Sequence, residues 1–135
     1  MVPGVLQDLR FGNSWRAVGA GLVLLVVYLS LTPDPVHVVD GPEGFDVQHF
    51  AAYFTLMIWW AQLVRPGWPR LVAGLALVAM GIGLEFVQGL TDYRTFDPLD
   101  MRANAIGVAA AYLLALTRLG GALAALEGRL APPPR

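Results

Sequence analysis

The sequence predicts an all-α membrane protein whose four transmembrane helices form a bundle, and composition and hydropathy lead to this prediction. Hydrophobic residues make up 56% of the 135 residues and charged residues only 14%, whereas soluble proteins average roughly 45–50% and about 25%. Mean hydropathy is +0.58. A soluble domain of this size has too little interior to bury so much apolar surface. The apolar residues also fall into four runs, each close to the roughly 20 residues of a membrane-spanning helix.

Turn signals separate the four runs and define their approximate ends. We place the spans at about residues 15–32, 46–64, 70–90 and 98–116. Pro66 and Pro69 interrupt the chain between the second and third spans. Asp97 followed by Pro98 is a typical helix start before the fourth.

The remaining parts of the chain are a lead, residues 1–14, and a tail, residues 119–135, on either side of the bundle at 15–118. The tail contains a short amphipathic stretch that we expect to lie at the membrane interface. The first apolar run is interpreted as a retained span, because it is long and no A-x-A-like cleavage site precedes Pro33.

Arginines and tryptophans predict the orientation of the bundle. Four spans put both chain termini on one side. That side then carries seven of the nine basic residues, all of which are arginines, while Arg94 and Arg102 lie on the other side. All four tryptophans also fall near the arginine-rich ends, as expected for an interfacial aromatic belt. Both termini are therefore predicted to be cytoplasmic, with loops 33–45 and 91–97 outside.

Composition also limits the classes of site and partner. There is no cysteine, which excludes disulfides and thiolate metal sites. The net charge is −1 and no basic patch exists, so nucleic acid is not an expected partner. The expected partners are membrane lipids. The oligomeric state is not predicted.

Polar residues gather near the outer ends of the second, third and fourth spans. Within each span their spacing of three or four puts them on one helix face, and the three stripes are Asp46-His49-Tyr53, Glu85-Gln88 and Asp97-Asp100-Asn104. A carboxylate as far inside a span as Glu85 costs on the order of 2–3 kcal/mol in lipid. Such residues turn inward and mark functional sites, so we expect one polar pocket between three helices. Small residues such as Gly81 and Gly107 are expected to bring the third and fourth helices close together.

Structural roles compete with this interpretation. A helix cap explains Asp97 better than a role in the pocket does, and Asp46 is explained equally well as a favourable anion in a first helical turn. Arg102 can reach the headgroups by snorkelling. The acidic residues of loop 33–45 (Asp34, Asp40 and Glu43) are explained by solvation alone.

Histidine and carboxylates near one another are suited to general acid–base chemistry, and also to binding a hard divalent ion or zinc. There is no H-E-x-x-H motif, cysteine pair or glycine-rich phosphate loop. The cofactor is therefore unknown, and we assign no metal ligand. The catalytic candidates are His49, Glu85 and Asp100, and the ligand-binding candidates are Arg94, Gln88, Asp46, Asn104 and Tyr53.

These residues resemble the motifs of the VanZ-like family of small membrane proteins. The matching segments are D46-V-Q-H49-F-A-A-Y53, E85-F-V-Q88 and R94-T-F-D97-P-L-D100-M-R-A-N104. The lysine that usually follows the first Asp of the family is absent, since Val47 stands there. The resemblance implies a four-helix protein of the bacterial plasma membrane and a set of functional positions. It implies no particular reaction and no link to antibiotic resistance.

Two hypotheses of function follow from these residues. In the first, the polar site binds or acts on a cell-envelope lipid or lipid-linked precursor. Arg94 holds the anionic headgroup, Glu85 and Asp100 act as acid, base or metal ligand, and His49 transfers protons. In the second, the protein is a non-enzymatic scaffold or assembly partner, and the polar residues form an interhelical hydrogen-bond network. Whether it is an enzyme is left open.

Overall fold

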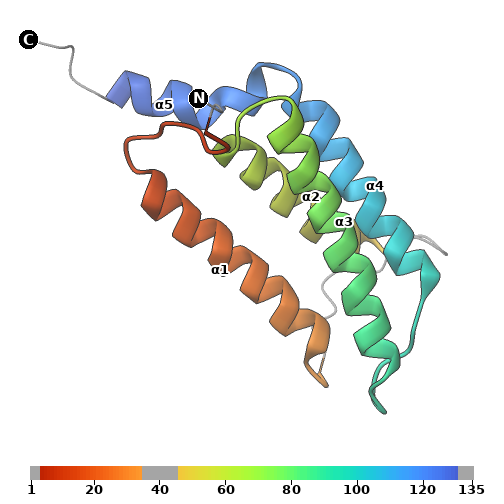
Figure 1. The fold of residues 1–135 in the computed structure, drawn as a ribbon. Coiled ribbons are helices and arrows are strands. Elements are labelled where there is room, and N and C mark those ends of the chain that lie inside the picture. The colour runs from red at the N-terminus through yellow and green to blue at the C-terminus, as the bar shows by residue number, and fades with distance from the viewer. Residues whose placement is uncertain (1–3, 35–45, 131–135) are drawn as a thin grey trace, which may run out of the picture.

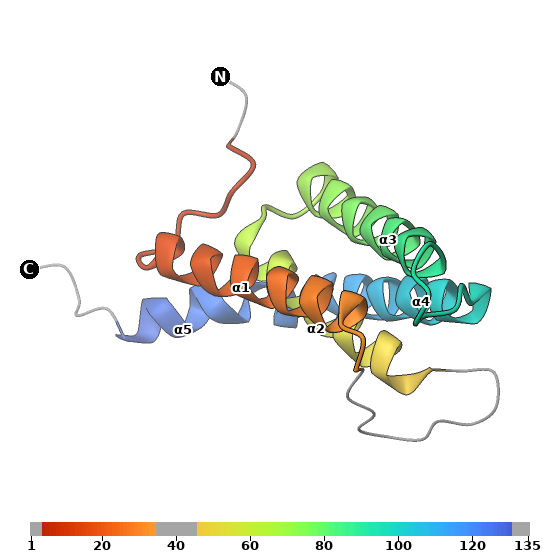
Figure 2. The ribbon, with the colours of Figure 1, turned by 90° about the horizontal axis from the view of Figure 1, so that it is seen from below.

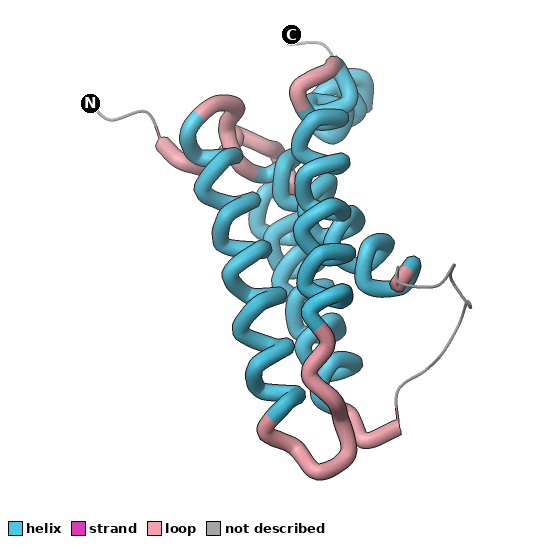
Figure 3. Tube along the Cα trace, turned by 90° about the vertical axis from the view of Figure 1, so that its right-hand side faces the viewer, coloured by secondary structure: helices cyan, strands magenta, loops and turns pink. Residues whose placement is uncertain are grey.

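The computed structural model describes residues 4–34 and 46–130, and these residues fold into α-helices. In chain order the elements are α1 (Gly12–Leu31), α2 (Val47–Leu63), α3 (Trp68–Gly89), α4 (Pro98–Ala115), a 3-10 helix η1 (Arg118–Gly121) and α5 (Ala122–Leu130). Within the described ranges the only β-type pairing is an isolated bridge between Leu6 and Val64. The predicted all-α class is confirmed for this part of the chain (Figure 3).

Helices α1 to α4 run alternately in opposite directions (Figure 1). Their bounds agree closely with the four predicted spans, and the largest difference is at the start of α1, at residue 12 instead of 15. Two polar caps explain two of the starts. Asp46 accepts hydrogen bonds from the backbone N–H groups of Gln48 and His49 at the start of α2, and Asp97 accepts one from Leu99 at the start of α4. Most of loop 33–45, including Asp40 and Glu43, lies outside the described residues.

The described chain has fewer candidate membrane spans than long helices. Helices α1 and α3 are long and apolar enough to cross a membrane. Helix α4 qualifies only as a bent pair with Arg118–Leu130, at an angle of 80°. Helix α2 has 17 residues, and α4 begins with charged and amide side chains that lower its hydropathy. Two or up to three candidate spans are therefore found in the described chain, where the sequence predicts four.

The core of the bundle lies between α2, α3 and α4, and α2 packs most extensively against α4. Tyr53, Leu56 and Met57 of α2 are at most 1% exposed. A side chain at Gly107 of α4 would overlap the backbone carbonyl oxygen of Phe50 in α2. The sequence analysis expected Gly107 to bring α4 close to α3, whereas its close backbone contact is with α2. The reason is that Gly107 lies on the face of α4 that α2 covers.

Helix α1 is set to one side of this core and buries little of its surface (Figure 1). Leu24 and Tyr28 in its outer half are 68% and 67% exposed. Such apolar exposure is expected of a helix that faces lipid. Its N-terminal half is held by tryptophans, since the indole nitrogen of Trp59 donates to the carbonyl of Trp15 at 3.2 Å.

Buried charged residues join the helices at the end that holds most of the arginines. Arg70, 3% exposed, donates to the carbonyl oxygens of Ala61, Ala115 and Gly120 at 2.8, 2.6 and 3.0 Å. These carbonyls lie at the C-terminal ends of α2, α4 and η1, where intrahelical donors run out. One guanidinium therefore caps three elements.

The tail is part of the folded unit as far as Leu130, and α5 lies beside the start of α1 (Figure 2). Glu127 accepts hydrogen bonds from the backbone N–H groups of Arg10 and Phe11, at 2.6 and 3.1 Å, and from the indole of Trp15 at 2.7 Å. Desolvation raises the pKa of Glu127, but these hydrogen bonds outweigh it and hold the pKa below its ordinary value. The first and last described segments thus meet at the same end of the bundle.

Candidate functional site

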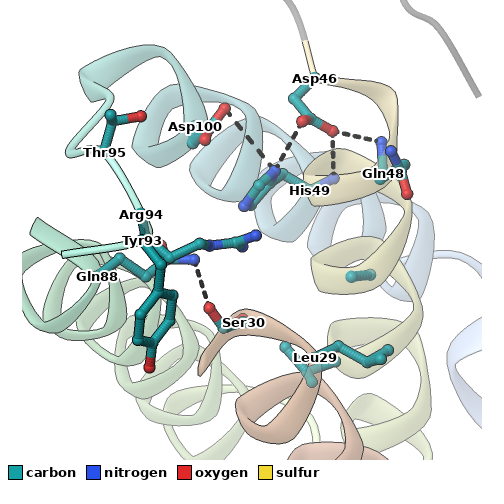
Figure 4. Close-up of a pocket in the computed structure, with 12 residues that line it drawn as sticks. Leu29, Ser30, Asp46, Gln48, His49, Gln88, Tyr93, Arg94, Thr95 and Asp100 are labelled. Atoms are coloured by element: carbon teal, nitrogen blue, oxygen red, sulfur yellow. Dashed lines mark hydrogen bonds and ion pairs between the residues drawn. The ribbon is translucent and has the colours of Figure 1, made fainter. Parts of the chain in front are cut away.

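A pocket of about 410 Å³ lies at the opposite end of the bundle (Figure 4). Four segments of the chain supply its walls: the end of α1, the start of α2, the end of α3 with the turn after it, and the start of α4. Asp46, His49 and Asp100 form its polar side, and Val26 and Leu29 of α1 form an apolar side. The expectation that the polar groups of the second, third and fourth helices meet at one end is confirmed.

Asp46, His49 and Asp100 form the most compact group of polar side chains in this pocket. Nδ1 of His49 lies 3.1 Å from Oδ2 of Asp46 and 3.8 Å from Oδ1 of Asp100. The other oxygen of Asp46, Oδ1, accepts the N–H groups of Gln48 and His49 at 2.8 and 3.0 Å. The capping role and the pocket role of Asp46 are therefore carried by different oxygens of one carboxylate. The partner of His49 is not Glu85, which the sequence left open.

His49 Nδ1 has no hydrogen bond of good geometry although a carboxylate oxygen lies 3.1 Å away. The atom itself is fully shielded, while about a fifth of the side chain is exposed to the pocket. The distance describes an electrostatic contact, and the angle at the imidazole does not suit proton donation along it. We therefore treat the pair as an ion-pair contact and not as a formed hydrogen bond.

Arg94 and Gln88 face the same pocket from the end of α3 and the turn that follows (Figure 4). Gln88 donates to the carbonyl of Ser30 at 2.7 Å and thereby ties α3 to the last turn of α1. Tyr93 supports this connection with a hydrogen bond to the carbonyl of Leu31 at 3.1 Å. The structure records no hydrogen bond or ion pair from the guanidinium of Arg94 to another described residue. A cation that lines a pocket without a protein partner is suited to binding an anion.

Glu85 does not line the pocket but lies beneath it and is 1% exposed. Its Oε1 accepts the backbone N–H of Asp97 at 2.6 Å. Asp97 in turn caps the first turn of α4 through Leu99, and that turn carries Asp100. Glu85 therefore fixes the position of Asp100 through the backbone, and the structure places no ligand-accessible surface on it.

Tyr53 and Asn104 lie in the same buried layer as Glu85, at 1% and 3% exposure. A Cβ added to Gly81 would approach both of them, at 3.1 Å from the Tyr53 ring and 3.0 Å from the Asn104 amide nitrogen. The hydroxyl of Tyr53 and Oδ1 of Asn104 have no hydrogen-bond partner among the described residues. Both side chains belong to the floor under the pocket and do not reach its surface.

The eight candidate residues thus divide into two layers. Five line the pocket, namely Asp46, His49, Gln88, Arg94 and Asp100, and three lie below it, namely Tyr53, Glu85 and Asn104. Sequence reasoning did not identify Ser30, Gln48 and Tyr93, which also line the pocket. Gln48 and Tyr93 could have been found, since they are adjacent to the candidates His49 and Arg94. Nothing in the sequence indicates Ser30, because its contribution to the contact with Gln88 is a backbone carbonyl.

Fold and composition define the class of the described chain, residues 4–34 and 46–130, as all-α with candidate membrane-spanning helices, although no known family model and no solved structure matches it. The chain is similar to "Uncharacterized protein C11E3.10" of the fission yeast Schizosaccharomyces pombe, with 36% identity over 112 residues. The match covers 78% of this chain and 66% of the yeast protein, which is just under two thirds of the latter's length. This relative is eukaryotic, so the comparison does not favour the bacterial origin expected from the VanZ resemblance.

Proposed function

We propose that the protein is a VanZ-like integral membrane protein whose pocket binds, or acts on, a lipid with an anionic headgroup. The observation that carries the proposal is the guanidinium of Arg94, which lines the pocket without a protein partner in the described chain. Arg94 holds the headgroup, and the carboxylates and imidazole on the opposite side supply acid–base chemistry. The apolar side formed by Val26 and Leu29 suits the lipid portion of the ligand.

The arrangement in the membrane is part of the proposal. All four long helices cross the bilayer, and α2, although 17 residues long, is at the short end of the range for a span. The arginine-rich end faces the cytoplasm and the pocket opens at the outer leaflet. The membrane is the plasma membrane and the ligand a cell-envelope lipid or lipid-linked precursor. A bacterial source is supported by the VanZ resemblance alone.

Orientation can be tested cleanly because the chain has no cysteine. Asp92→Cys at the pocket end and Arg118→Cys at the opposite end are exposed positions. A membrane-impermeant maleimide added to intact cells is expected to label the first and not the second. The reverse pattern would contradict the proposed orientation. Labelling of both from outside would contradict an odd number of spans between them.

Lipid binding is tested with the purified protein in nanodiscs of phosphatidylcholine with and without phosphatidic acid, followed by native mass spectrometry. The wild type is expected to retain the anionic lipid preferentially, and Arg94→Met to lose this preference. Arg118→Met, at the opposite end, serves as the matched control. Turnover of the retained lipid is then compared for Asp100→Asn and His49→Ala, since both residues line the pocket. Equal retention by the wild type and Arg94→Met, with wild-type behaviour of the other two variants, would exclude the proposal.

The second candidate is a scaffold without catalytic activity, in which the polar residues hold the helices together. The hydrogen bonds Glu85–Asp97 and Gln88–Ser30 favour it, since each joins two segments and consumes polar groups internally. It predicts that Glu85→Ala and Gln88→Ala lower thermal stability without changing lipid retention. Unchanged stability in both variants would count against it.

A further inference from the structure

We infer that Asp46, His49 and Asp100 form a binding site for a divalent metal ion of the zinc or manganese class. This inference concerns the polar side of the pocket only. It does not depend on the lipid proposal, because the ion can bind whether or not a lipid is the ligand.

The spacing of the three ligand atoms fits a single coordination sphere. One ligand atom from each residue lies within 4.8 Å of the others. Nδ1 of His49 is 3.1 Å from Oδ2 of Asp46 and 3.8 Å from Oδ1 of Asp100. Zinc–ligand bonds of about 2.0–2.2 Å in a tetrahedron require neighbouring ligand atoms to be about 3.4 Å apart. The two distances from His49 bracket this value, and the two carboxylate oxygens lie within 4.8 Å of one another, so the side chains must close in on the ion by about 1 Å.

The lone pairs that these groups do not use in hydrogen bonds are suited to binding a cation. His49 Nδ1 is shielded from solvent and has no hydrogen-bond partner within residues 4–34 and 46–130, and a neutral imidazole nitrogen is a common metal ligand. Asp46 uses Oδ1 for the N–H groups of the helix start and leaves Oδ2 toward His49. Two carboxylates facing one imidazole carry a net negative charge that an ion would neutralise.

The supporting structure is rigid on both sides of the cluster. Asp46 and His49 are one turn apart at the start of α2, where the cap fixes Asp46. Asp100 is held by the chain of contacts from Glu85 through Asp97. The close contact between Gly107 and the Phe50 carbonyl sets the spacing of the two helices. Such outer contacts orient metal ligands and contribute to metal affinity.

The cluster supplies three protein ligands and faces a pocket of about 410 Å³. Three protein ligands with the fourth position open is the arrangement of catalytic zinc sites, whereas structural sites are closed by four. One nitrogen and two oxygen donors also suit manganese. The remaining positions of the ion would therefore be filled by water or by a ligand in the pocket.

The alternative is a proton in place of the ion, with a charged His49 held between two carboxylates. The two states differ in metal content. The test uses full-length protein purified without a polyhistidine tag, stripped with a chelator and titrated separately with Zn²⁺ and Mn²⁺ in the absence of added lipid. Bound metal is measured by calorimetry and elemental analysis.

One equivalent of either ion is expected to bind the wild type saturably. Asp100→Asn and His49→Ala are expected to weaken the binding at least tenfold, and the control Asp92→Asn, an exposed carboxylate at the same end, to leave it unchanged. No saturable binding of either ion, or equal binding by all variants, would overturn the inference. Because the titration contains no lipid, its failure is distinguishable from failure of the lipid proposal.

Two further measurements keep the test informative if a variant folds poorly. Size-exclusion profiles and melting temperatures of the apo variants are compared with those of the wild type. X-ray absorption of the zinc-loaded wild type is expected to show one imidazole among oxygen donors. Two imidazoles would place the ion elsewhere and overturn the assignment.

Discussion

The two ends of the bundle use charged residues in opposite ways. At the arginine-rich end, Arg70 and Glu127 each make three hydrogen bonds to other parts of the chain. At the pocket end, Arg94 lines the cavity with no hydrogen bond or ion pair to a described residue, and His49 Nδ1 has no hydrogen bond to any of these residues. The charged groups of the first end are used in stabilising contacts, whereas Arg94 at the second end faces the pocket. The two ends therefore differ in how their charged residues are used, although the arginine-rich end has more of them.

The largest expected loss of stability comes from Arg70→Met, which removes the donors of three carbonyl groups. Leaving a buried polar group unsatisfied costs about 1–3 kcal/mol, so we expect a large drop in melting temperature in detergent. Arg118→Met is the matched control, because Arg118 is exposed at the same end. Equal melting temperatures for Arg70→Met and Arg118→Met would show that the hydrogen bonds of Arg70 do not stabilise this end of the bundle.

A smaller loss of stability is expected for Glu85→Ala. Unlike Arg94 at the same end, Glu85 already accepts a hydrogen bond inside the protein, from the backbone N–H of Asp97. The variant leaves the N–H of Asp97 without an acceptor and opens a small void, at a cost of about 2 kcal/mol. Glu85→Gln keeps an oxygen at this place and should be closer to the wild type. Thermal unfolding of the three proteins measures the difference. A Glu85→Ala variant as stable as the wild type would show that the Asp97 contact contributes nothing.

Glu127→Gln is expected to destabilise the protein modestly and to change its pH dependence. The pKa of Glu127 is held below its ordinary value, so its stabilising contribution is present above the ordinary pKa and disappears as pH falls through the lowered one. The wild type should therefore exceed Glu127→Gln in melting temperature near neutral pH and converge with it on acidification below about pH 4.5. A constant difference at all pH values would contradict this assignment.

The smallest effect on stability is expected for Arg94→Met. No hydrogen bond or ion pair to a described residue is lost, so the free energy of unfolding should change by no more than in a typical surface variant, about 0.5 kcal/mol or less. Retention of anionic lipid should nevertheless fall. A strongly destabilised Arg94→Met would show that this arginine serves the fold, and the two ends would then be alike.

The helix bounds could be predicted from the sequence, and so could the gathering of polar groups at one end of the bundle. Both depend on local sequence patterns. Hydropathy runs, prolines and the caps at Asp46 and Asp97 act within a few residues, and period-3.6 spacing assigns faces. The division between pocket-lining and buried residues could not be predicted. Glu85 and Asp100 both lie on the helix faces that their spacing predicts. They differ in burial, because Glu85 lies in the interior and Asp100 faces the pocket.

Contacts between residues far apart in the sequence could not be predicted either. From the sequence, Arg70 is only one of the seven arginines predicted on the cytoplasmic side, although it is buried and bonded to residues up to 50 positions away. Glu127 was not singled out, because its partners lie 112 to 117 positions earlier. The contacts of Arg70 and of Glu127 produce no periodic pattern in the sequence. The number of membrane spans was similarly uncertain, since α2 is short and α4 begins with polar residues.

The close contact between Gly107 and the Phe50 carbonyl has a mechanical consequence for the pocket. Backbone atoms in contact leave no space for α2 and α4 to slide, so the wall that carries Asp46, His49 and Asp100 keeps its shape. Helix α1, which buries little of its surface, is held at the pocket end by the hydrogen bonds from Gln88 and Tyr93. A change in pocket volume therefore comes from displacement of α1 or of the turn after α3, which carries Tyr93 and Arg94, and hydrogen exchange in these two segments is where occupancy of the pocket would be registered first.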